Sequence, residues 1–225
     1  WTAAHQATLL RHAFRALGIE RPVVVGHSWG ALVALELALN HPEAVSGLVV
    51  LSGYYDVTIR YDVPLVAVSA VPGVGDLLRY TVSPVLGAAL LPMNIKAMFA
   101  PQPVPSQFKR DFPYGFPVRP WQIRAESQDA VTMMPAAIDM HQRFRDLRLP
   151  VFIVAGTKDR VVGHESHANW LHNQIPGSRL RLINGAGHMV HYVCPQQVAD
   201  GIDQVAQSGH PTEYVATDDG VVNYP

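Results

Sequence analysis

The stretch VVVGHSWGALVALELAL, Val23 to Leu39, constrains the fold more than any other part of the 225-residue chain. Three β-branched apolar residues are typical of a strand buried in a parallel sheet, and the Ala, Leu, Val and Glu residues after Trp29 favour a helix. Ser28 lies at the junction, with Gly26 two residues before it and Gly30 two residues after it. A sharp strand-to-helix turn strains the backbone, so we expect a side chain at either glycine to collide.

The rest of the chain alternates between strand and helix patterns. Apolar residues at three- and four-residue spacing predict a first helix over Thr2–Leu17, which Gly18 would end. Short apolar runs predict buried strands, and amphipathic runs predict the helices between them: strands at Pro22–Gly26, Ala44–Leu51, Pro150–Ala155 and Arg179–Ile183, helices at Trp29–Asn40, His164–Gln174 and from Pro195 to about Gln207. This alternation predicts the α/β class, with a mostly parallel sheet flanked by helices.

A long insertion separates the second and third predicted strands. Residues 53–149 are rich in proline and apolar residues, and a structureless loop of that length is uncommon, so we expect a helical cap with a return helix. Residues 1–52 and 150–207 then form the core. Residues 208–225 have no periodicity, and we expect a tail that wraps the surface or moves.

A membrane span is the alternative interpretation of Val63–Leu91 in this insertion. Two prolines and two charged residues, Pro72, Pro84, Asp76 and Arg79, interrupt that apolar run. A span needs about 20 consecutive, mostly apolar residues. We therefore expect no transmembrane segment.

Composition excludes several classes of protein. The chain is 48% hydrophobic and 16% charged, which is enough to bury a sizeable core. Its net charge is −1 with the charges scattered, so a nucleic-acid partner is not expected. The single cysteine, Cys194, excludes an internal disulfide. That fits a cytoplasmic protein, and it also fits many periplasmic ones.

Two further residues have the types and places that Ser28 would need for catalysis. A serine hydroxyl is a weak nucleophile, which requires a base and an acid that orients the base. Asp159 follows the third strand in GTKDRVV, and His188 follows the fourth in NGAGHMVHY. All three residues would lie beyond the carboxyl ends of parallel strands. The backbone N–H of Trp29 would then donate to an oxyanion.

Nearby residues offer alternatives for these roles. Asp56, soon after the second strand, is the rival acid, but Asp159 ends a better strand and precedes a helix. His191 is the rival base, but the glycine-flanked loop favours His188. The side chains of His27, Trp29 and Met189 are candidates for lining the substrate pocket.

Three histidines, His164, His167 and His172, raise the question of a metal site. Metal sites need several ligands at suitable spacing, and only Glu165 lies near them. We interpret this segment as a solvated helix and expect neither a metal nor a cofactor.

The segments GHSWG, GTKDRVV and GAGHMVHY together resemble the α/β-hydrolase superfamily, over nearly the whole chain. The resemblance implies an α/β-hydrolase fold with a cap and a catalytic triad of Ser28, Asp159 and His188. Related haloalkane dehalogenases and soluble epoxide hydrolases use an aspartate nucleophile, whereas a serine implies an acyl-enzyme and carbonyl chemistry. The simplest activity is hydrolysis of carboxylic esters, and the apolar cap suggests hydrophobic, medium-chain or lipid-like small molecules.

Other functions fit the same triad. C–C bond hydrolysis, amide hydrolysis, perhydrolysis and acyl transfer all use it, and a C–C hydrolase would need a cap arginine such as Arg79, Arg119 or Arg124. A non-catalytic accessory protein is the third class. The intact set of Ser, Asp and His disfavours it.

The serine turn comes unusually early in the chain. Four strands usually precede it in this superfamily, together with an H-G motif that supplies the second oxyanion donor, whereas only one helix has room here. Either these residues are an excerpt of a longer protein, or other structure covers the first strand. We favour the excerpt, because an exposed apolar edge strand promotes aggregation and Trp1 is an unusual start.

Overall fold

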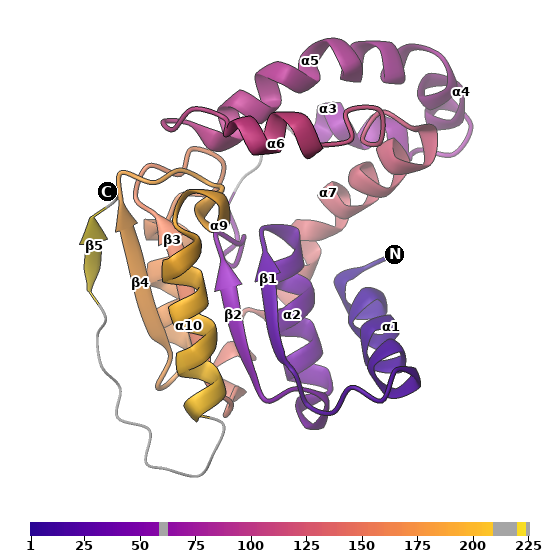
Figure 1. The fold of residues 1–225 in the computed structure, drawn as a ribbon. Coiled ribbons are helices and arrows are strands. Elements are labelled where there is room, and N and C mark those ends of the chain that lie inside the picture. Colours follow the sequence, from indigo (N-terminus) through magenta and orange to yellow (C-terminus); the bar gives the residue numbers. More distant parts are fainter. Residues whose placement is uncertain (59–62, 209–219, 224–225) are drawn as a thin grey trace.

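The computed structural model describes residues 1–58, 63–208 and 220–223. Its centre is a sheet of five parallel strands in the order β1-β2-β3-β4-β5 (Figure 1). The strands are Val23–His27, Gly47–Leu51, Val151–Gly156, Arg179–Asn184 and Val221–Asn223. The predicted α/β class with a parallel sheet is therefore confirmed.

Helices cover both faces of this sheet and continue into the insertion. The α-helices are α1 Ala3–Ala16, α2 Trp29–Asn40, α3 Val63–Ala67, α4 Val74–Tyr80, α5 Val82–Phe99, α6 Ser106–Asp111, α7 Pro120–Met140, α8 Trp170–Gln174, α9 Val190–Val193 and α10 Pro195–Ser208. Short 3₁₀ turns lie at Pro42–Ala44, Val68–Ala70 and Phe144–Asp146, and a π-helical turn at Glu165–Asn169 precedes α8.

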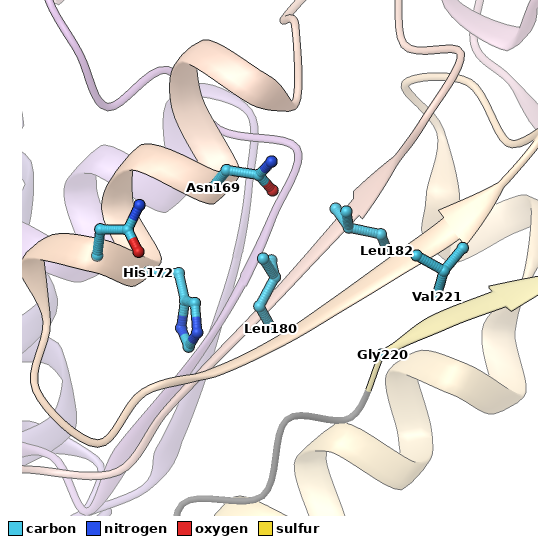
Figure 2. Close-up of a pocket in the computed structure, with 7 residues that line it drawn as sticks. Asn169, His172, Leu180, Leu182, Gly220 and Val221 are labelled. Atoms are coloured by element: carbon cyan, nitrogen blue, oxygen red, sulfur yellow. The ribbon is translucent and has the colours of Figure 1, made fainter.

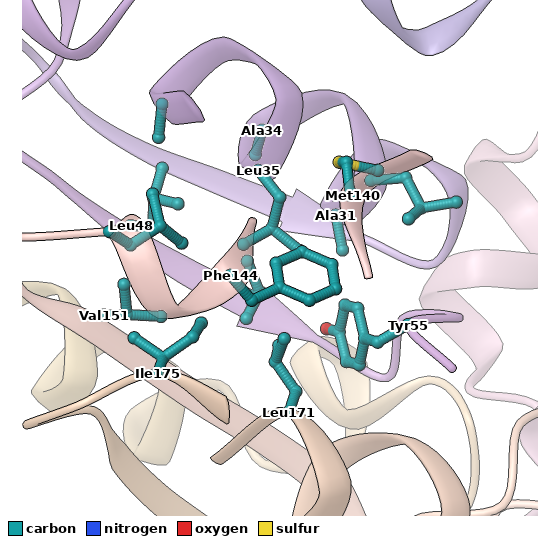
Figure 3. Packing of buried hydrophobic residues seen from close by; sticks show 14 of the residues in the cluster. Ala31, Ala34, Leu35, Leu48, Tyr55, Met140, Phe144, Val151, Leu171 and Ile175 are labelled. Atoms are coloured by element: carbon teal, nitrogen blue, oxygen red, sulfur yellow. The ribbon is translucent and has the colours of Figure 1, made fainter. Parts of the chain in front are cut away.

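Successive residues of the central strands point to opposite faces and are buried on both. Leu48 and Val50 of β2 pack in one apolar layer with α2, and Val49 and Leu51 pack in the other with α10. Side chains alternate between faces along a strand, so a strand covered on both sides must be apolar at every position. Figure 3 shows the first layer, where Leu35 of α2 lies near Phe144.

The sequence placed most elements correctly but missed some bounds. The second strand begins at Gly47 rather than Ala44, because Pro42–Ala44 forms a 3₁₀ turn. The first strand extends to His27. Gly18 has a φ of +66° directly after the α1 cap, which suits its predicted role in ending that helix.

The predicted tail contains a fifth strand. Val221–Asn223 pairs in parallel with β4, which corrects the expectation that the whole of 208–225 lacks regular structure. Residues 209–219 and 224–225 of that predicted tail lie outside the described residues.

The insertion between β2 and β3 contains α3 to α7, which lie beyond the carboxyl ends of the strands (Figure 1). Within the described ranges, α5 is the one helix long and apolar enough, by length and composition, to cross a membrane. Only 11% of the 18 residues of this helix are buried. The sequence analysis expected helices in this insertion but placed the apolar run at Val63–Leu91, whereas α5 begins inside that run and continues eight residues past it.

Candidate active site

Ser28 lies in a strained turn between β1 and α2. Its backbone has φ +53° and ψ −119°, a conformation that non-glycine residues rarely adopt. The Ser28 N–H donates to the carbonyl oxygen of Leu51 on β2 (2.9 Å), which ties the turn to the neighbouring strand. Strain of this kind persists only where the surrounding structure imposes it, and it is frequent at functional sites.

Only one of the two flanking glycines is required sterically. A Cβ at Gly26 would lie 2.4 Å from the carbonyl oxygen of Gly30, so the turn cannot accept a side chain there. A Cβ at Gly30 would meet no atom of the described residues within 4 Å. The expectation that both positions exclude side chains is therefore wrong for Gly30, because its backbone makes the close approach to Gly26 while the place of its own Cβ is open.

Asp159 and His188 form a buried, hydrogen-bonded pair. The distance from His188 Nδ1 to Asp159 Oδ2 is 2.8 Å, and the two side chains are 2% and 0% exposed, respectively. The other carboxylate oxygen, Oδ1, accepts from the N–H groups of Val161 (2.8 Å) and Val162 (2.9 Å). Because an ionised carboxylate only accepts, this contact assigns the proton to Nδ1 and leaves Nε2 as the basic nitrogen.

His27 joins the serine turn to the loop that carries His188. Its Nε2 lies 3.1 Å from the carbonyl oxygen of His188, to which it donates as a neutral imidazole. The His27 ring also contacts the rings of His188 (centroids 4.7 Å apart) and His191 (4.4 Å apart). Burial, followed by the nearby His188 and His191, lowers the pKa of His27 to about 3. Its contacts are thus with the His188 loop.

Ser28 and His188 are brought to the same edge of the sheet through His27, but no hydrogen bond between their side chains occurs within the described structure. Catalytic hydrogen bonds are often longer before substrate binds and shorten in the reacting complex. In the described structure the hydrogen bond between Asp159 and His188 is therefore formed, and the one between His188 and Ser28 is not.

The Trp29 side chain and its backbone N–H have separate surroundings. The ring nitrogen donates to Gln6 Oε1 on α1 (3.2 Å), and the ring packs against the α2 side of the core. The ring nitrogen is therefore engaged by α1. The backbone N–H is in the first turn of α2, where such groups lack an intrahelical acceptor. This backbone N–H remains the candidate donor to an oxyanion.

Met189 contacts the cap. It is 6% exposed and packs in a small apolar cluster with Ile95 and Phe99 of α5 and Phe108 of α6. The residue that follows the candidate base is therefore held by cap side chains.

The rival acid and base have other partners. The distance from Asp56 Oδ1 to His141 Nε2, after the end of α7, is 3.2 Å. His191 is in α9, its ring contacts His27, and its buried Nδ1 has no hydrogen-bond partner within the described residues. Burial lowers the pKa of His191. Asp159, not Asp56, contacts an imidazole at the end of β4.

One of the three histidines that we expected on a solvated helix, His167, is buried in a hydrogen-bond network, which corrects that expectation at this position. His167 Nδ1 accepts from the N–H groups of Tyr55 and Asp56 (3.1 Å each), and its Nε2 lies 3.2 Å from Thr58 Oγ1. Among residues 1–58, 63–208 and 220–223, no three His, Cys, Asp or Glu residues are grouped closely enough to hold a metal. His167 instead orders the chain that leaves β2.

A cavity of about 350 Å³ opens between α8 and the strands β4 and β5. Figure 2 shows that Leu180, Leu182 and Val221 form its sheet side and that Asn169 and His172 form its helix side. None of the candidate triad residues lines this cavity.

The sequence interpretation missed Gln102, between α5 and α6. Its Nε2 donates to the carbonyl oxygen of Gly185 (2.8 Å), and its Oε1 accepts from the N–H of Gly187 (3.1 Å). A single glutamine between two prolines has no periodicity or motif that would reveal this contact. Only the tertiary structure brings residue 102 to the His188 loop.

Comparison with known proteins agrees with this architecture. The family model described as the α/β hydrolase fold matches residues 1–195. An uncharacterized protein of Mycobacterium tuberculosis, Rv2715, is 27% identical over 232 residues, a match that covers 95% of this chain and 64% of that protein. The chain thus spans less than two thirds of that relative's length.

Solved structures show the same fold. An α/β hydrolase fold protein from Burkholderia ambifaria matches with a TM-score of 0.72 and 23% identity, covering 90% of this chain and 73% of the other. An esterase from Exiguobacterium antarcticum matches with a TM-score of 0.69 and 18% identity, covering 92% and 74%. The chain belongs to the α/β-hydrolase family.

Proposed function

We propose that this chain carries the catalytic residues of a carboxylic-ester hydrolase that forms an acyl-enzyme on Ser28. The contact that carries the proposal is the 2.8 Å hydrogen bond between His188 and the buried Asp159. It fixes the imidazole with Nε2 unprotonated, which is the state that a general base needs. An esterase among the similar solved structures supports the same chemistry.

In this mechanism Ser28 Oγ attacks the ester carbonyl while His188 Nε2 accepts the serine proton. The tetrahedral oxyanion accepts from the Trp29 N–H, and His188 then donates the proton to the leaving alkoxide. Water, deprotonated by His188, hydrolyses the acyl-enzyme and regenerates Ser28. Asp159 stays ionised throughout and stabilises the imidazolium.

The apolar cap next to His188 favours hydrophobic esters. Phe99, Phe108 and Met189 form a buried apolar cluster beside the base. If an acyl chain lies against such a surface, each added methylene contributes about 0.8 kcal/mol of burial. For p-nitrophenyl esters between acetate and hexanoate, kcat/KM is then expected to rise about fourfold per methylene.

The C–C hydrolase alternative is less well supported by the cap arginines. Arg79 is buried and paired with Asp76 of the same helix, and the Arg119 guanidinium lies over the rings of Phe116 and Trp121. Arg124 is exposed on α7. A C–C hydrolase would need an arginine beside His188 to bind the substrate carboxylate. No contact of Arg79, Arg119 or Arg124 with His188 occurs among the described residues.

The direct test is ester hydrolysis by Ser28→Ala. Loss of the nucleophile is expected to lower kcat/KM on p-nitrophenyl butanoate by at least about 10⁴-fold. Ser106→Ala, at an exposed position of α6, is the matched control and should retain wild-type turnover. Activity in Ser28→Ala within about tenfold of wild type would refute the proposal, because so small a loss of transition-state stabilisation does not fit removal of the nucleophile.

A further inference from the structure

Gln102 connects the cap to the backbone on the amino-terminal side of His188. It follows α5 and is more than eighty residues away in sequence from the loop that it contacts. Its amide both donates to Gly185 and accepts from Gly187. One side chain therefore satisfies two backbone groups within three residues of the candidate base.

A close backbone contact also joins the cap to the loop before His188. A Cβ at Gly187 would lie 2.1 Å from the carbonyl oxygen of Ala100, so the cap backbone lies directly against this loop. On the other side of His188, Met189 is buried in one apolar cluster with Phe99 and Phe108. Cap residues thus contact the chain immediately before and immediately after the base.

The loop needs such support, because its own sequence provides little rigidity. Gly185 has a φ of +80°, and two of the three residues before His188 are glycines, which have the greatest backbone freedom. Asp159 restrains the imidazole at Nδ1, and His27 restrains the His188 carbonyl. Gly185 is also held from the end of β3, because its N–H donates to Thr157 Oγ1 (2.9 Å). For the Gly187 N–H, the acceptor among the described residues is Gln102.

We propose that Gln102 is a positioning residue for His188, and that its paired hydrogen bonds make the placement of the base depend on docking of the cap. The inference rests on the proposed role of His188 as general base. Misplacement of a catalytic group by about 1 Å can cost about 100-fold in rate. Loss of the Gln102 contacts therefore lowers kcat, while substrate binding is largely retained.

The test is Gln102→Met in the full chain, because methionine keeps the volume and loses both hydrogen bonds. We expect kcat to fall about 10- to 100-fold and KM to stay within about twofold. Gln107→Met, on the exposed surface of α6 in the same cap, is the matched control and should keep wild-type kcat. Gln102→Leu provides a second variant if the first does not fold.

The pH profile separates positioning from general stabilisation. His188 is faced by Asp159 from the β3 loop, by His27 from β1 and, across the His27 ring, by His191 from α9. A looser contact with Asp159 stabilises the imidazolium less, so the acid limb of kcat/KM in Gln102→Met should move about half a pH unit lower. A lower thermal midpoint with an unmoved acid limb and full kcat would overturn the inference.

A readout without substrate separates this inference from the proposed function. The proton that His188 Nδ1 shares with Asp159 gives a proton NMR signal, which should broaden in Gln102→Met and stay sharp in Gln107→Met. If wild type hydrolyses no ester, the proposed function fails, and this signal still decides the positioning role. An unchanged signal together with wild-type kcat in Gln102→Met would contradict it.

Discussion

The acid–base pair and the serine turn lie at one edge of the same sheet, yet the described structure encloses them to different degrees. Asp159 follows β3, which has a strand on each side, and its side chain is 0% exposed. Ser28 follows β1, which is paired only with β2, and Val25 of that strand is 44% exposed. The sheet and the cap hold His188, the proposed base, whereas a strained turn on an edge strand of the described sheet holds Ser28, the proposed nucleophile.

This difference separates two requirements of the site. Orientation of the imidazole depends on buried hydrogen bonds, so it should be sensitive to changes in polar groups. Presentation of the serine depends on backbone geometry, so it should be sensitive to added volume. Substitutions in the Asp159–His188 pair, in the serine turn, and at His27, where these two halves of the site meet, separate the two requirements.

The largest expected effect is that of Asp159→Asn on the acid–base half. The asparagine carbonyl can still accept from Val161 and Val162, and its amide then faces His188 Nδ1 as a donor. The imidazole proton moves to Nε2, and the base faces Ser28 in the wrong tautomer. We expect kcat on a p-nitrophenyl ester to fall about 10⁴-fold.

The control for this change is Asp56→Asn, at the rival carboxylate beside His141. It should change kcat by less than about threefold, because this pair is partly exposed and such pairs contribute about 1 kcal/mol or less. If Asp56→Asn were the more damaging of the two, the assignment of the acid would be wrong.

A smaller effect is expected from alanine at the glycines of the serine turn. Gly26→Ala should lower the free energy of unfolding by about 1–3 kcal/mol, because its Cβ would overlap the Gly30 carbonyl oxygen. Gly30→Ala, in the first turn of α2 with open space around it, should be neutral or should stabilise by up to about 1 kcal/mol. Urea unfolding measures both, and equal losses would contradict this account of the turn.

The sequence predicted those parts of the site that a pattern within one short segment indicates. Ser28, Asp159 and His188 each follow a predicted strand end, and parallel strands bring such ends to one edge. The α2 bounds were predicted as observed, because a run of strong helix formers ends before Pro42. The Asp159–His188 hydrogen bond itself required the structure.

The features that sequence patterns missed depend on tertiary contacts. β5 has three residues and pairs only with β4, which is too short for a periodicity to emerge. Gly30 looked essential because the G-x-S-x-G pattern is symmetric, whereas of the two glycines it is Gly26 where an added Cβ would collide, with the Gly30 backbone. The hydrogen bond of His27 to the His188 carbonyl joins residues 161 positions apart in the sequence, so no local pattern indicates it.

The smallest effect concerns His27, where the two halves meet. Because burial lowers its pKa to about 3, the unfolded chain binds a proton below about pH 6.5 that the folded chain does not bind until about pH 3. This group's contribution to stability is present above pH 6.5 and is lost as the pH falls through that window. The slope from this one group reaches at most about 1.4 kcal/mol per pH unit.

Urea unfolding between pH 5 and pH 8 measures that slope. His27→Gln keeps a hydrogen-bond donor without a titrating ring, so its stability should fall less steeply below pH 6.5 than that of wild type. His12→Gln, at an exposed position of α1, is the control and should behave as wild type. Equal slopes in His27→Gln and wild type would mean that the His27 ring titrates alike in the folded and unfolded chain.

The central claim is that Ser28 is the nucleophile that His188 and Asp159 activate. Intact-mass spectrometry after incubation with a fluorophosphonate tests it most directly, because the reagent attaches to an activated serine and releases fluoride. We predict one adduct per chain in wild type, none in Ser28→Ala, and much slower labelling in Asp159→Asn. An adduct that persists in Ser28→Ala, or its absence from a wild-type protein that hydrolyses esters, would contradict the account.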